Sequence, residues 1–164
     1  MAADSPADTA PRVSREIDRP YEGAWVGATH HFACRVYFED TDTAGIVYYA
    51  NYLKYMERAR SDMLRALGID QRATLEAGGG VYVVAEVGIK YRSPARLDDD
   101  LQVLSELIEI RAASSVIHQR VMRGREILAD ATVTAAFIAP DGRPQRQPRD
   151  WIDRFERLKG EGAK

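Results

Sequence analysis

The sequence predicts an α+β domain in which a five-stranded antiparallel sheet wraps around one long central helix. Three observations lead to this prediction. One segment has apolar residues at helical spacing, five segments have strand character, and the links between the later strands are short. Short links favour antiparallel pairing, and a sheet with one apolar face needs a covering layer, for which the chain offers one substantial helix.

The first strand and the long helix follow one another along the chain. Residues 31–38 alternate apolar and more polar positions and are predicted to form a strand, which the acidic, glycine-containing stretch 39–45 interrupts. Apolar residues then recur at steps of three and four: Tyr52, Tyr55, Met56, Ala59, Met63, Leu64 and Leu67. This spacing predicts a helix, and Gly68 followed by Ile69 is a typical helix end.

The remainder of the chain is predicted to be mainly β. Four further strands are expected at residues 81–90, 101–110, 115–122 and 127–137. Turn signals follow the last two of them, at 123–125 and 140–142. A short amphipathic helix is predicted near the C-terminus from the spacing of Trp151, Ile152, Phe155 and Leu158.

Composition limits the classes of protein to consider. The chain has 164 residues, enough for one domain with its own core, and its net charge of −2 does not indicate nucleic-acid binding. No apolar run approaches the roughly 20 residues of a membrane span. The polar N-terminus lacks the apolar region of a secretory signal. We therefore expect a flexible tail at residues 1–28 and one domain at 29–160, in the cytoplasm. The single cysteine, Cys34, suits a reducing compartment and is interpreted as a small buried hydrophobe.

The segment from Tyr37 to Tyr52 combines carboxylates, a glycine and the predicted start of the long helix. The first turn of a helix has unpaired backbone N–H groups and the positive end of the helix dipole. These donors can bind the oxygen of a polarised carbonyl, and the same field favours an ionised carboxylate that acts as nucleophile or general base. A thioester suits this arrangement because its carbonyl is electrophilic and its thiolate leaves readily. Acidic residues before a helix are more commonly caps, so residue types alone do not decide the function.

The order of residues in this segment resembles the signature of the 4-hydroxybenzoyl-CoA thioesterase family of hotdog-fold proteins. Seven residues match it: Asp42, Gly45, Ile46, Val47, Tyr49, Asn51 and Tyr52. Within this family, the residues of this segment and the string from Ile89 to Asp99 are most similar to those of the YbgC-type acyl-CoA thioesterases. This branch is associated with the bacterial Tol–Pal cell-envelope system. The resemblance covers residues 32–158.

This resemblance implies roles for the matched residues. Asp42 would be the catalytic carboxylate, either as nucleophile or as general base, and the backbone N–H of Tyr49 would donate to the thioester oxygen. Gly45 and Val47 would contact the substrate. Many members of the branch have a histidine at the position of Tyr49. If that histidine acts through its imidazole, the tyrosine changes the rate or its pH dependence; if only the backbone N–H acts, the tyrosine is tolerated.

The resemblance also implies a substrate and an assembly. The substrate would be an acyl-CoA, with acyl carrier protein as an alternative carrier and no metal or redox cofactor. The chain would form a homodimer or homotetramer with the active site at the subunit interface. The acyl group itself stays open, because every acyl group needs an apolar slot whose depth depends on subunit packing.

Two other carboxylates compete with Asp42. Glu57 lies in the predicted helix, where some hotdog thioesterases have their catalytic glutamate, but the His-Gly-Gly-like helix entry that accompanies it is absent. We interpret Glu57 as a solvated or ion-paired residue. Asp40, on a segment expected to be extended, would point the same way as Asp42 and is interpreted as a supporting residue.

The basic residues and the histidines suggest further sites. Lys90 and Arg92, in a cluster with Arg96, are predicted to bind the phosphates of CoA. The histidines lack the spacing of a metal site, so no metal is predicted; they are His30, His31 and His118. A dehydratase on this fold would need a catalytic histidine beside a carboxylate, and the motif around Asp42 contains none.

An alternative function is a non-catalytic acyl-binding or scaffold protein of the cell envelope or of lipid synthesis. The string of Asp42, Gly45 and Tyr49 favours the enzyme, because a scaffold has no need of an acid beside a helix start.

Overall fold

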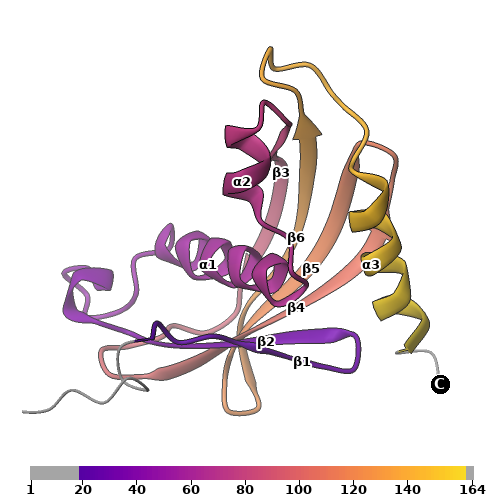
Figure 1. The fold of residues 1–164 in the computed structure, drawn as a ribbon. Coiled ribbons are helices and arrows are strands. Elements are labelled where there is room, and N and C mark those ends of the chain that lie inside the picture. Colours follow the sequence, from indigo (N-terminus) through magenta and orange to yellow (C-terminus); the bar gives the residue numbers. More distant parts are fainter. Residues whose placement is uncertain (1–18, 162–164) are drawn as a thin grey trace, which may run out of the picture.

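A computed structural model describes residues 19–161, which form one six-stranded sheet and three α-helices (Figure 1). The strands are β1 (Ala24–Val26), β2 (Thr29–Arg35), β3 (Val81–Tyr91), β4 (Asp100–Ile110), β5 (Ser114–Arg123) and β6 (Glu126–Ile138). The helices are α1 (Asn51–Ala66), α2 (Gln71–Glu76) and α3 (Arg149–Glu161), with a 3₁₀ turn, η1, at Phe38–Asp40. The strand order is β1-β2-β4-β5-β6-β3, and all neighbouring strands are antiparallel.

The long helix α1 lies across one face of the curved sheet (Figure 1). Its side chains Tyr55, Met56 and Ala59 are completely buried. They belong to an apolar cluster with inward-facing residues of β4, β5 and β6, namely Val103, Val121, Leu128, Ala129 and Ala131. Removal of this apolar area from water stabilises the contact between helix and sheet. The helix predicted at 52–67 is therefore confirmed, together with its role as the cover of the sheet.

A second apolar cluster lies beside α3. Trp151 and Phe155, one turn apart on α3, are buried there with Met63 of α1 and Phe137 of β6. The Phe137 and Trp151 rings meet edge to face, with their centroids 5.6 Å apart. The predicted C-terminal amphipathic helix is confirmed and anchors the end of the domain. None of the helices within residues 19–161 is long and apolar enough to cross a bilayer.

The predicted count of five strands and one long helix is wrong, although the α+β class holds. The sixth strand, β1, lies inside the segment expected to be a tail. It pairs with β2, with Trp25 opposite His30, because Gly27 adopts a φ of +59° that lets the chain reverse between the strands. The strand expected at 31–38 also ends early, at Arg35, and η1 follows. Residues 1–18 of the expected tail lie outside the described residues.

Candidate active site

Asp42 opens a tight turn whose carboxylate faces solvent. The Gly45 N–H donates to the Asp42 carbonyl at 2.9 Å, and the Asp42 N–H donates to the Ile46 carbonyl at 2.9 Å. Gly45 has a φ of +72°, a conformation in which a Cβ would be strained. The Ala44 N–H donates to Asp42 Oδ1 at 2.8 Å, which fixes the carboxylate without burying it. The turn therefore holds one exposed carboxylate in a defined position.

Hydrogen bonds attach this turn to the start of α1. The Asp40 carbonyl, just before the turn, accepts from the Tyr48 N–H and from Asn51 Nδ2, each at 2.9 Å. Asn51 is the first residue of α1 and is buried. After the turn, the Val47 N–H donates to the Ala95 carbonyl at 2.9 Å. The segments on both sides of Asp42 are thus fixed beside the helix entrance.

The start of α1 keeps backbone donors available. The residue before the helix, Ala50, gives no side-chain cap, and the first turn contains no acidic residue. Among residues 19–161, no acceptor pairs with the Tyr49 N–H. The Tyr49 side chain is exposed, and its carbonyl accepts from the Tyr91 hydroxyl at 3.0 Å. The structure therefore brings Asp42 and Tyr49, the two predicted catalytic residues, to one end of the same helix.

The four residues predicted to contact the substrate differ in their exposure and in the element that holds them. Gly45 lies exposed in the Asp42 turn. Val47 is only 3% exposed and packs in the core, so it supports the turn from inside. Tyr91 is the last residue of β3, and the exposed Lys90 and Arg92 lie on either side of it; alternation along the extended chain directs their side chains away from the face of Tyr91.

Arg92 also has a partner on the outer face of the sheet. Its Nη2 lies 3.3 Å from Asp130, which His118 Nε2 contacts at 2.7 Å. The hydrogen bond from His118, reinforced by Arg92, lowers the pKa of Asp130. The basic cluster is therefore partly neutralised at Arg92, while Lys90 and Arg96 are exposed. No group of residues within 19–161 has the donors for a metal ion.

The other candidates for a catalytic residue lie in surroundings that differ from the exposed turn of Asp42. Asp40 belongs to η1 rather than to an extended segment, so the expectation that it points the same way as Asp42 is wrong. Asp40 is buried, and its carboxylate accepts from the Tyr37 N–H at 2.9 Å, which agrees with a supporting role. Glu57 pairs with Arg60, as the ion-paired interpretation expects. Burial raises the pKa of Cys34 to about 11, which keeps its thiol protonated and poorly nucleophilic.

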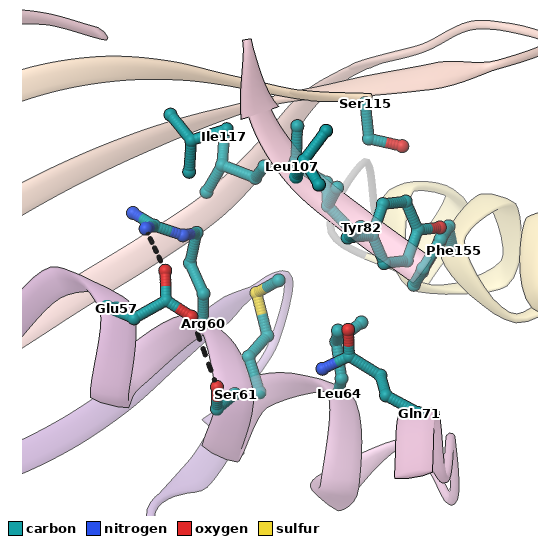
Figure 2. Close-up of a pocket in the computed structure, with 14 residues that line it drawn as sticks. Glu57, Arg60, Ser61, Leu64, Gln71, Tyr82, Leu107, Ser115, Ile117 and Phe155 are labelled. Atoms are coloured by element: carbon teal, nitrogen blue, oxygen red, sulfur yellow. Dashed lines mark hydrogen bonds and ion pairs between the residues drawn. The ribbon is translucent and has the colours of Figure 1, made fainter. Parts of the chain in front are cut away.

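The sequence did not reveal a cavity of about 60 Å³ between α1, α2 and the sheet, shown in Figure 2. Glu57, Arg60 and Ser61 lie on its α1 side, and Tyr82 and Phe155 lie at its other end (Figure 2). One signal was available: Arg60 follows the buried Ala59 and precedes the buried Met63, so a cation interrupts the apolar face of the helix. A cavity itself depends on how distant segments pack, which periodicity does not describe.

Comparison with known proteins identifies the family. The model of the thioesterase-like superfamily matches residues 36–155. An acyl-CoA thioesterase YbgC from Haemophilus influenzae is 43% identical over 107 residues, which cover 65% of this chain and 79% of that protein. An acyl-CoA thioester hydrolase YbgC from Escherichia coli O6:H1 is 37% identical over 124 residues, which cover 74% of this chain and 92% of that protein.

A solved structure supports the same assignment. The crystal structure of a probable thioesterase from Bartonella henselae superimposes with a TM-score of 0.70 and 34% sequence identity, covering 74% of this chain and all of the other. The predicted hotdog class agrees with this match and with the sheet that curves around α1. Given the fold, the Asp42 turn beside the helix start and the family model over most of the chain, the protein belongs to the thioesterase-like superfamily.

Proposed function

We propose that the protein hydrolyses acyl-CoA thioesters to a carboxylic acid and CoA, with Asp42 as its catalytic carboxylate. The observation that supports this most is the exposed Asp42 carboxylate in a turn hydrogen-bonded to the start of α1, where the Tyr49 N–H has no acceptor within residues 19–161. The thioester carbonyl oxygen accepts from that N–H, and the dipole of α1 stabilises the charge that develops on it.

Asp42 acts in one of two ways from the same position. Its carboxylate attacks the carbonyl carbon and displaces the CoA thiolate, and water then hydrolyses the resulting anhydride; or it takes a proton from a water that attacks instead. In both routes the leaving thiolate ends as the CoA thiol. Gly45 gives the turn its shape and Val47 anchors it. Lys90 and Arg92, whose side chains lie on the other face from Tyr91, bind the phosphates of a CoA that passes around the end of β3, in competition with the Arg92–Asp130 pair. Acyl carrier protein is a second carrier that the same site admits.

A second copy of the chain completes the site in this proposal. The helix entrance lies next to β3, an edge strand whose exposed residues include Val84, Val87 and Tyr91. Exposed edge strands with apolar side chains are normally covered in folded proteins. A homodimer formed through this edge, or a tetramer of two such dimers, would shelter the thioester from bulk water. The link to the Tol–Pal system stays a prediction.

The Asp42→Asn variant tests this function. We expect hydrolysis to fall by about 100-fold or more, because an amide is neither a nucleophile nor a base. The fold should persist, because the amide oxygen of the substituted side chain can still accept from the Ala44 N–H. Thiol release from a panel of acyl-CoA substrates measures activity, with Asp153→Asn, an exposed residue of α3, as the matched control. Near-normal turnover of a folded Asp42→Asn protein refutes the assignment, and no release by the wild type from any substrate favours the scaffold function.

A further inference from the structure

The turn that leads into α1 contains a carbonyl that the helix does not use. The Asn51 N–H donates to the Tyr48 carbonyl at 2.8 Å. Further along, the Leu53 N–H donates to the Ala50 carbonyl at 3.2 Å. The Tyr49 carbonyl lies between these two acceptors, and no backbone N–H among residues 19–161 donates to it. Its hydrogen bond therefore has to come from outside the helix.

The donor is the hydroxyl of Tyr91, which lies 3.0 Å from the Tyr49 carbonyl oxygen. Tyr91 is the last residue of β3 and pairs with Ala129 of β6. The Tyr91 ring meets the ring of Tyr52 edge to face, with the centroids 5.5 Å apart, and Tyr52 is buried. The Tyr52 hydroxyl in turn accepts from the Ala95 N–H at 2.9 Å. The hydroxyl of Tyr91 is thus supported by a paired strand and by a ring that is itself fixed.

Hydrogen bonds hold the peptide groups on both sides of Tyr49. A peptide group is planar, so a bond to its oxygen also restricts the direction of its N–H. The group that carries the Tyr49 N–H is held through the Tyr48 carbonyl by the Asn51 N–H. The next group, which carries the Tyr49 carbonyl, is held by Tyr91. Because both planes are held, the two backbone dihedral angles of Tyr49 between them are also fixed.

The direction of the Tyr49 N–H matters for the proposed reaction. A donor stabilises an oxyanion only when it points at the position that the oxygen occupies in the transition state, and a displacement of about 1 Å can cost roughly 100-fold in rate. We propose that Tyr91 is a positioning residue for thioester hydrolysis: by holding the Tyr49 carbonyl, its hydroxyl keeps the Tyr49 N–H directed at the thioester oxygen. This inference rests on the proposed function, because it takes that oxygen to bind at the start of α1.

The Tyr91→Phe variant removes the hydroxyl and keeps the ring. Its kcat should fall by about tenfold, which is less than the roughly 100-fold to 1,000-fold lost when an oxyanion donor is removed, because the Tyr49 N–H is kept but no longer fixed. KM should change by less than about twofold, since the Tyr91 hydroxyl acts on the backbone rather than on the substrate. For the same reason, kcat should fall by the same factor for every acyl-CoA that the wild type hydrolyses.

Tyr82→Phe is the matched control. It removes a hydroxyl that donates to Gln147 from the same strand, nine residues and roughly 30 Å from Tyr91, and it should leave kcat unchanged. A rise in KM at constant kcat in Tyr91→Phe, or a loss that depends on the acyl group, would assign Tyr91 to substrate binding and overturn the proposal. Kinetics of Tyr91→Phe equal to those of the wild type would overturn it as well.

NMR relaxation of the backbone amides tests the positioning without catalysis. In Tyr91→Phe the order parameters of the Tyr49 and Ala50 N–H groups should fall from a rigid value of about 0.85 to below about 0.6, and Tyr82→Phe should not change them. Unchanged order parameters in Tyr91→Phe would overturn the positioning role even if hydrolysis is slower. A fall in the order parameters of a protein that hydrolyses no thioester would instead refute the proposed function and leave the positioning of Tyr49 by Tyr91 in place.

Discussion

Asp40 and Asp42 are two residues apart, yet their carboxylates have opposite surroundings. Asp40 is buried and its carboxylate accepts from the N–H of Tyr37, the residue before η1, while Asp42 is exposed beside the helix start. The 3₁₀ turn causes this difference, because it breaks the alternation that would place both side chains on one face. One acid therefore shapes the loop and leaves the other free for chemistry.

His30 gives the stability of the protein a pH dependence. It is completely buried, with Nε2 3.0 Å from Asp62 Oδ2, and burial lowers its pKa below 6.5 despite the attraction of Asp62. Below about pH 6.5 the unfolded chain binds a proton at this histidine that the folded protein does not. Above about pH 6.5, protonation of His30 should therefore not change the free energy of unfolding. As the pH drops from 6.5 towards the pKa of His30 in the folded protein, the free energy of unfolding should fall.

Urea denaturation at several pH values measures this effect. His30→Gln, which keeps a hydrogen-bond donor for Asp62, should flatten the decrease below pH 6.5. His31→Gln changes the neighbouring side chain, which lies on the other face of β2, and should keep the decrease. If the two variants have the same pH profile, the buried histidine is not its source.

At the scale of elements, the start of α1 leaves the Tyr49 N–H without an acceptor among residues 19–161, at a cost in helix stability. It lacks both a side-chain cap and an acidic residue in its first turn, where most helices have one or both. Ala50→Asp should stabilise the protein by about 0.3–1 kcal/mol through the helix dipole. The same negative charge should oppose the developing oxyanion and lower kcat.

Ala50→Asn separates charge from shape, because it adds a side chain of the same size without the negative charge. Thermal denaturation measures the stability of each variant, and thiol release from one acyl-CoA measures its kcat. A gain in both stability and kcat for Ala50→Asp would contradict the role of the helix start in binding the oxyanion.

The sequence predicted those elements whose signals are local. The spacing from Tyr52 to Leu67 located α1 to within a residue or two, and the motif around Asp42 located the candidate site. β1 was missed because three residues are too few to show a period, and it exists only through its pairing with β2. The cavity between α1, α2 and the sheet was missed because its walls come from segments that are distant in the sequence.

At the scale of the whole molecule, the two edges of the sheet differ in character. β1 is a short edge of three residues, whereas β3 is an edge of eleven residues with several exposed apolar side chains. Long apolar edges are a liability unless another chain covers them. This asymmetry is the reason why the proposed homodimer would form through β3, together with the neighbouring start of α1.

Val84→Lys tests that arrangement. Val84 is exposed on β3, and in a symmetric dimer the substitution places a charge on each side of the interface, at a cost of about 3–5 kcal/mol for every charge that is buried without a partner. Sedimentation should therefore show monomers for Val84→Lys, and hydrolysis per chain should fall. Val26→Lys puts the same charge on the exposed part of β1, the opposite edge, and should leave the assembly unchanged. Loss of assembly only in Val26→Lys would place the contact at the other edge, and a wild type that is monomeric at all concentrations would exclude a shared active site.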